Sequence, residues 1–122
     1  MGLIGCATIE NKIVCRQHEM LLKQIEDINI NDGVDRQEAT ILAQQYFVNY
    51  VSGCGAVGEP IDKGDYWEFY PVIGYAARKM DNQMHVDKKS GAISFKDYPT
   101  LSDSRNMLLD KQRELSNNLG CK

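Results

Sequence analysis

The stretch 66–95 constrains the fold more than any other part of the chain, because it holds most of the strand-forming residues and the single tryptophan. The polar segment 87–91 (DKKSG) lies between two short apolar runs, 84–86 and 92–95. A polar turn that ends in glycine between such runs indicates a β-hairpin, because glycine adopts the positive φ that closes the turn. We expect Asp87 to accept hydrogen bonds from the backbone of its own turn.

The same stretch predicts three antiparallel strands, at about 66–75, 83–87 and 92–96. Pro71 lies inside the first of them. Because proline cannot donate a hydrogen bond to a neighbouring strand, the strand 66–75 is expected at a sheet edge, or Pro71 at a bulge. The Gly-rich segment 53–65 reads as a loop.

Apolar periodicity predicts three helices, at 10–28, 36–51 and 102–117. The second helix has the clearest start, because Asp35 and Glu38 are spaced as a capping box. Its broad apolar stripe indicates that it lies between the sheet and another layer. Residues 100–103 are a second candidate capping box, and the last helix has a sparse leucine seam. The stripe of the second helix consists of Ala39, Leu42, Ala43, Tyr46, Phe47 and Tyr50, and the seam of Leu101, Leu108, Leu115 and Leu119.

Helices followed by strands and a final helix predict an α+β domain, with helices packed on one face of a small antiparallel sheet of about three to four strands. The 122 residues fit a single domain, 1–122, in which 1–9 is expected to be a flexible N-terminus. The net charge of −3 and the absence of a long basic run argue against a nucleic-acid partner. No apolar run is long enough to span a membrane.

The four cysteines, at positions 6, 15, 54 and 121, lack the C-x-x-C spacing of zinc or redox sites. Free thiols in a reducing cytoplasm are the expected state, and one or two disulfides in a periplasmic protein are the alternative. Residues 3–6 (LIGC) look like a lipoprotein cleavage box. Only five residues precede Cys6, so a lipid anchor is expected only if the true start lies upstream.

Three motifs suggest a binding or catalytic site, but the sequence around each of them argues against that site. Residues 27–38 are spaced like a calcium-binding EF-hand loop, but the glycine comes one position late, at Gly33. Residues 53–58 read G-x-G-x-x-G, yet they follow a predicted helix instead of a strand. Cys54 and His85 could form a nucleophile and base, but no third residue orients them. The sequence therefore predicts no catalytic residues, no metal and no cofactor.

The strand at 66–75 has an unusual concentration of aromatic residues. Alternation places Trp67 and Phe69 toward the helices and Tyr66, Glu68 and Tyr70 on the opposite face. Because tyrosine is enriched at protein interfaces, we predict that these three residues bind a partner. The partner is either a different protein or a second copy of the chain.

Three segments together resemble a bacterial family: 32–39 (DGVDRQEA), 64–69 (GDYWEF) and 85–93 (HVDKKSGAI). They are similar to the small immunity proteins of bacterial toxin systems that have NTF2-like or cystatin-like folds. The hairpin and the tryptophan-containing strand are also similar to PepSY-type modules. The resemblance covers about residues 32–100.

This resemblance implies a non-enzymatic protein that binds and neutralises a cognate toxin, in a type VI or contact-dependent secretion system. It carries no catalytic residue over to this chain. The alternatives are a PepSY-like periplasmic or lipid-anchored module that inhibits a protease or holds a ligand, and a small enzyme on an NTF2-like cone. A cytoplasmic location is expected for the immunity protein.

Overall fold

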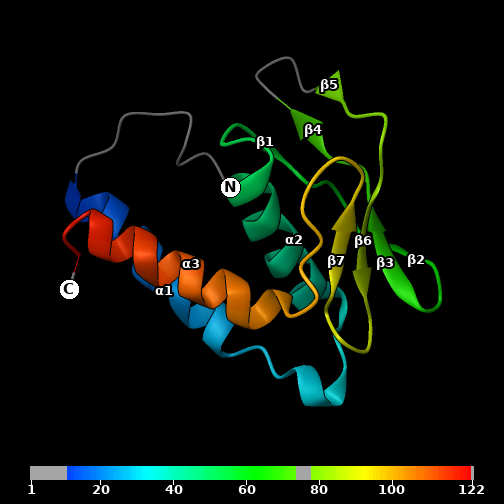
Figure 1. The fold of residues 1–122 in the computed structure, drawn as a ribbon, viewed down its shortest axis with the longest axis horizontal. Helices are drawn as coiled ribbons and strands as arrows, with labels where there is room; N and C mark the ends of the chain where they lie inside the picture. Colours follow the sequence, from blue (N-terminus) through cyan, green and yellow to red (C-terminus); the bar gives the residue numbers. More distant parts are fainter. Residues whose placement is uncertain (1–10, 74–77, 122) are drawn as a thin grey trace.

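The computed structural model describes residues 11–73 and 78–121 and has the predicted α+β class (Figure 1). The predicted flexible segment 1–9 lies outside the described residues. The three predicted helices are all present, with boundaries within two residues of those expected. They are α1 (Asn11–Glu26), α2 (Arg36–Tyr50) and α3 (Ser104–Asn118), with the short 3-10 helix η2 (Ile30–Asp32) between the first two.

The strands form two antiparallel sheets, and the hairpin region belongs to the larger one. The four-stranded sheet has the order β2 (Ile61–Asp62), β3 (Tyr66–Phe69), β6 (Met84–Asp87) and β7 (Ile93–Phe95). The three-stranded sheet has the order β1 (Gly55–Ala56), β4 (Val72–Ile73) and β5 (Arg78–Lys79). Two of these strands, β1 and β2, lie in the segment that the sequence indicates to be a loop.

The predicted strand 66–75 is wrong in two respects, and Pro71 explains the first. The chain breaks between Phe69 and Val72, so that β3 and β4 belong to different sheets. Pro71 lies in this break, where its missing N–H costs no ladder hydrogen bond, and its carbonyl accepts from Met80 N at 2.8 Å. Because β2 pairs with the other side of β3, β3 is an interior strand and not an edge.

The hairpin between β6 and β7 confirms the predicted turn. The Asp87 carboxylate accepts from the backbone N–H groups of Lys89 and Ser90, at 3.0 and 2.8 Å. These hydrogen bonds lower the pKa of Asp87. Gly91 has a φ of 75°, as the turn requires.

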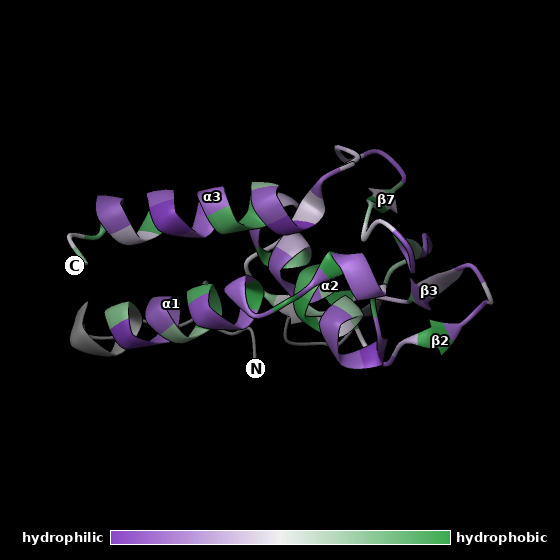
Figure 2. Cartoon of the chain, turned by 90° about the horizontal axis from the view of Figure 1, so that it is seen from below, coloured by the Kyte–Doolittle hydropathy of each residue, from purple (hydrophilic) through white to green (hydrophobic). Residues whose placement is uncertain are grey.

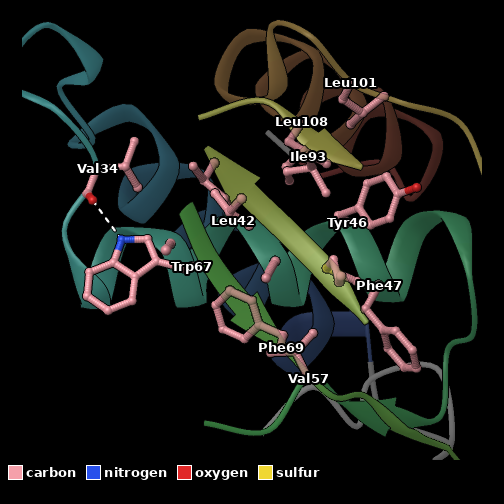
Figure 3. Close-up of a cluster of buried hydrophobic side chains, with 14 of the residues drawn as sticks. Val34, Leu42, Tyr46, Phe47, Val57, Trp67, Phe69, Ile93, Leu101 and Leu108 are labelled. Atoms are coloured by element: carbon pink, nitrogen blue, oxygen red, sulfur yellow. Dashed lines mark hydrogen bonds between the residues drawn. The ribbon is translucent and has the colours of Figure 1, made fainter. Parts of the chain in front are cut away.

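Helix α2 is buried against the four-stranded sheet on one side and the α1–α3 pair on the other (Figure 1). The predicted capping box is present: Glu38 N donates to Asp35 at 2.8 Å, and Asp35 N donates to Glu38 at 3.1 Å. Its stripe meets Trp67, Phe69 and Ile93 from the sheet in one core (Figure 3). Tyr46 is fully buried, and its hydroxyl donates to Pro99 O at 2.5 Å.

Gly55 allows the three-stranded sheet to approach α2. A Cβ at this position would lie 2.3 Å from Val72 O and 2.8 Å from the Phe47 ring, and its φ is +145°. No other residue fits there. Backbone packing therefore accounts for this glycine of the G-x-G-x-x-G segment.

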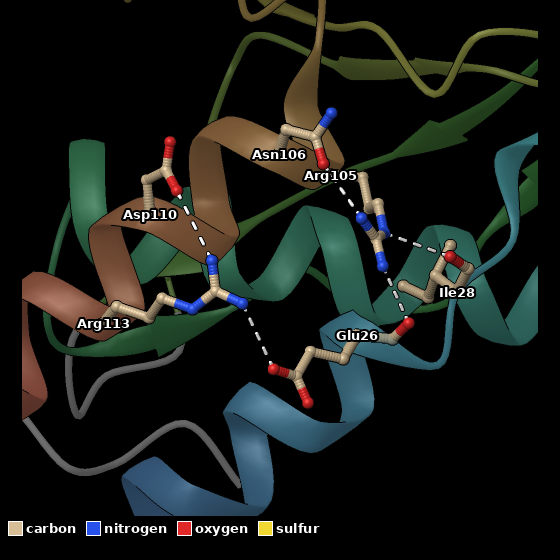
Figure 4. A network of polar contacts seen from close by, with 6 residues as sticks. All are labelled: Glu26, Ile28, Arg105, Asn106, Asp110 and Arg113. Atoms are coloured by element: carbon tan, nitrogen blue, oxygen red, sulfur yellow. Dashed lines mark hydrogen bonds and ion pairs between the residues drawn. The ribbon is translucent and has the colours of Figure 1, made fainter.

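The start of α3 differs from the predicted capping box, because its N-cap is Asp103 and makes no side-chain cap hydrogen bond. Two other side chains fix this end. Ser104 Oγ donates to Gly91 O at 2.6 Å. Arg105 donates to the carbonyls of Ile28 and Glu26, at 3.1 and 2.8 Å, and so satisfies acceptors at the C-terminus of α1 (Figure 4).

Helices α1 and α3 run side by side, away from the sheet (Figures 1 and 2). The two buried residues His18 and Gln112 meet between them, where the Gln112 amide donates to His18 Nδ1. Burial lowers the pKa of His18, so the neutral ring is favoured. Leu119, the last member of the predicted leucine seam, is 43% exposed and does not join the core.

The expectation of free thiols is wrong. Cys15, next to the start of α1, is bonded to Cys121, just after α3, with 5.5 Å between their Cα atoms. Cys54 is also disulfide-bonded. The sequence could not choose this pairing, because it depends on the antiparallel arrangement of two helices that are far apart in the chain.

We expect Tyr46→Phe to lower the free energy of unfolding by about 1–2 kcal/mol, because the Pro99 carbonyl loses a hydrogen-bond donor in a partly buried place. Urea denaturation measures this change. Tyr50→Phe is the matched control, since the Tyr50 ring stacks on Tyr46 at 5.3 Å and is retained in both variants. Equal stability of Tyr46→Phe and the wild type would contradict the role of this hydrogen bond.

His18 predicts a loss of stability in acid. Its folded-state pKa lies below the ordinary value of 6.5, so the unfolded chain binds a proton more readily than the folded one. The stabilisation is complete above pH 6.5 and is lost as the pH falls through the folded-state pKa. Free energies of unfolding measured between pH 7.5 and 5 should fall less steeply for His18→Gln than for the wild type. Parallel curves would exclude His18 as the cause.

Candidate functional site

The outer face of the four-stranded sheet, which points away from the helices, contains the predicted partner-binding residues. Strand alternation places Trp67, Phe69 and Val86 in the core. The side chains that alternate with them along β3 and β6, such as Glu68 and His85, point outward. The register aligns Ile61, Glu68, His85 and Ser94 in one row across the four strands, and Tyr66 lies beside it. We call these five residues the outer face.

Tyr66 and His85 form the aromatic part of the outer face. Their ring centroids are 4.3 Å apart, with an interplanar angle of 36°. Both residues are half-buried, and Ser94 and Ile61 beside them are exposed. Aromatic side chains in this state offer apolar area together with a polar group, which is the composition of many protein-binding surfaces.

Glu68 lies at the centre of the row and is only 7% exposed. Its carboxylate is 3.4 Å from His85 Nε2 and 3.9 Å from Lys63 Nζ. A buried carboxylate is costly unless cations compensate it. Both partner side chains are far more exposed than Glu68, at 39% for His85 and 45% for Lys63, so water also solvates them.

The structure brings together two of the three residues that the sequence predicts. Tyr66 and Glu68 are linked through His85. Tyr70 follows the last residue of β3 and is half-buried, next to the break at Pro71. The sequence did not predict that Lys63 and His85 lie beside Glu68. The alternation of β6 could have indicated His85, but the place of Lys63 depends on the β2–β3 turn.

A hollow of about 310 Å³ lies between the start of α2 and the hairpin turn, apart from the outer face. Three of the charged side chains that line it already have partners within the protein. Asp35 and Glu38 cap α2, and Lys88 pairs with Asp62 at 2.5 Å. The Lys88 ammonium also lies 4.5 Å from the centroid of Trp67. Among the described residues no group of three His, Cys, Asp or Glu side chains could hold a metal ion. The hollow is lined by Asp32, Gly33, Val34, Asp35, Glu38 and Lys88.

The Cys54–His85 pair does not form a nucleophile and base. Cys54 is disulfide-bonded and therefore has no thiol to activate. His85 instead lies on the outer face with Glu68 and Tyr66.

Comparison with known proteins gives no relative for this fold and face. No family model, no curated protein and no solved structure matches the chain. Within residues 11–73 and 78–121, no helix combines the length and hydrophobicity needed to cross a membrane.

We expect Glu68→Gln to change the free energy of unfolding by less than about 1 kcal/mol, because its partners Lys63 and His85 are solvated and glutamine keeps the size of the side chain. Urea denaturation checks this, with Lys63→Ala as a control that removes one partner only. A loss above about 3 kcal/mol would mean that Glu68 belongs to a buried structural ion pair. In that case Glu68 would not be available for recognition.

Proposed function

We propose that this chain is a non-enzymatic immunity protein that binds a bacterial toxin and neutralises it by direct contact. The observation that carries the proposal is the outer face, where Tyr66, Glu68 and His85 lie together on the side of the sheet opposite the helices. The resemblance of residues 32–100 to immunity proteins supports the choice of a toxin as the partner.

The chemistry of the outer face suits a protein partner. The tyrosine and histidine rings are already in contact, so little side-chain freedom is lost when a partner covers them. The Glu68 carboxylate offers an acceptor to an arginine or lysine of the partner, in addition to its present partners Lys63 and His85. The net charge of −3 favours the approach of a basic protein.

The disulfides bear on where the protein works. Structural disulfides persist in oxidising compartments and are rare in the cytoplasm of most bacteria. The Cys15–Cys121 bridge therefore favours action outside the cytoplasm, against a toxin that acts there. The same observation favours the second candidate function, a PepSY-like exported module that inhibits a protease or holds a ligand.

The experiment is co-expression with the product of the adjacent gene, exported to the periplasm of a bacterial host. If that product is the toxin, it should stop growth, the chain should restore growth, and the two proteins should elute as one complex in size-exclusion chromatography. Failure to restore growth together with failure to form a complex would refute the proposal. If the isolated chain forms a dimer that Tyr66→Ala disrupts, the outer face serves self-association instead.

Tyr66→Ala should weaken binding of this toxin at least tenfold, which corresponds to about 1.4 kcal/mol, because it removes the ring that contacts His85. Calorimetric titration measures the dissociation constant. Tyr70→Ala tests the edge of the same face. Met20→Ser is the matched control, since Met20 is 58% exposed on α1, away from the sheet. A large fall in melting temperature for Tyr66→Ala would instead indicate that Tyr66 supports the fold.

A further inference from the structure

We propose that the Cys15–Cys121 disulfide is a site of thiol–disulfide exchange with dithiol reductants. Its cleavage frees the outer parts of α1 and α3 from each other, while α2 and the four-stranded sheet stay folded. We call residues 15–22 and 111–121 the outer helix pair. The proposal goes beyond the proposed function and does not depend on it.

The outer helix pair has little apolar packing of its own. Its two buried side chains are the polar residues His18 and Gln112, and its leucines are half-buried or exposed. Among the side chains of the two helices that the structure describes, the buried apolar ones lie nearer the sheet, and they are Ile25, Leu108 and Leu109. Figure 2 shows that hydrophilic residues predominate along both helices. Helix pairs without a buried apolar seam open at low free-energy cost.

Among the described side chains, one hydrogen bond joins the two segments of the outer helix pair, between Gln112 and His18. Arg113 pairs at 3.3 Å with Glu26, which lies nearer the sheet (Figure 4). The ion pairs Lys111–Glu114 and Arg113–Asp110 lie within α3 and do not link it to α1. The disulfide is therefore the strongest link between these segments.

The bridge is placed where a reductant can reach it. Cys15 and Cys121 are half-buried and line a hollow of about 760 Å³ at the end of the helix pair. Arg16 and Arg113 line the same hollow, together with Glu19. A thiolate is the attacking species in exchange, and guanidinium groups attract it and stabilise the thiolate that leaves.

The exchange balances as a two-electron reduction. One thiolate of the reductant attacks a bridge sulfur and forms a mixed disulfide, and the bond electrons leave on the other cysteine, which takes a proton. The second thiol of the reductant, as its thiolate, attacks the mixed disulfide and releases the remaining cysteine, which is also protonated. The protein gains two electrons and two protons, and the dithiol becomes a disulfide.

The structural test is hydrogen–deuterium exchange on the wild type and on Cys15→Ser/Cys121→Ser. This double variant leaves Cys54 unchanged, so it separates the two sites of disulfide bonding. We expect exchange about 100-fold faster at 15–22 and 111–119, with rates in α2, β3 and β6 within about threefold of the wild type. Unchanged protection of α3 would overturn the proposal, and so would equal acceleration across α2 and β3.

The chemical test is cleavage of the native wild type by dithiothreitol, followed by alkylation and peptide mass analysis. The bridge should open without denaturant. Arg16→Gln should slow cleavage about twofold and the matched variant Glu19→Gln should accelerate it about twofold, because they remove opposite charges from the same hollow. Cleavage that occurs only in denaturant would refute the accessible site.

Discussion

Burial of α2 on two sides is the constraint on which the remaining elements depend. Its stripe fills the space against Phe69 and Met84 of the sheet, and its other side faces the α1–α3 pair. The three-stranded sheet can also approach this helix, because Gly55 presents no side chain to Phe47. Since the sheet has one face against α2, its other face points away from the helices, and that outer face is what we propose as the recognition surface.

Loops in this protein are fixed by side chains that bond to distant backbone carbonyls. Trp67 Nε1 donates to Val34 O at 2.9 Å, Tyr46 donates to Pro99 O, and Ser104 donates to Gly91 O. Arg105 does the same for the end of α1. Each bond ties a regular element to a segment that lacks a regular pattern of its own. Positions of loops therefore follow from a few polar groups and not from apolar packing alone.

The sequence predicted the parts of the fold that local rules determine. The capping box at Asp35 and the turn at Asp87 depend on near neighbours in the chain, and both are confirmed. Trp67 and Phe69 lie in the core as alternation predicts, but Glu68 between them is buried as well. The two-residue strands β1 and β2 could not be predicted, because strands this short have no periodicity. The pairing of Cys15 with Cys121 and the burial of Glu68 also depend on distant contacts.

For the outer face, the sequence predicted two residues of β3 but not their neighbours on the adjacent strands. Tyr66 and Glu68 follow from alternation along one strand. The link between them is His85, which comes from a neighbouring strand, and the register that aligns it with Glu68 is a property of the folded sheet. The same register adds Ile61 from β2, a strand that the sequence does not reveal. For this site, the contacts between neighbouring strands therefore could not be predicted from the sequence.

The Cys15–Cys121 bridge has a mechanical consequence. The bonded residues are 106 positions apart, so the bridge encloses the described strands and almost all of the helical residues in one covalent ring. Tension applied between Cys15 and Cys121 passes directly across the two sulfur atoms. While the bond is intact, such a pull does not stretch the chain that the ring encloses.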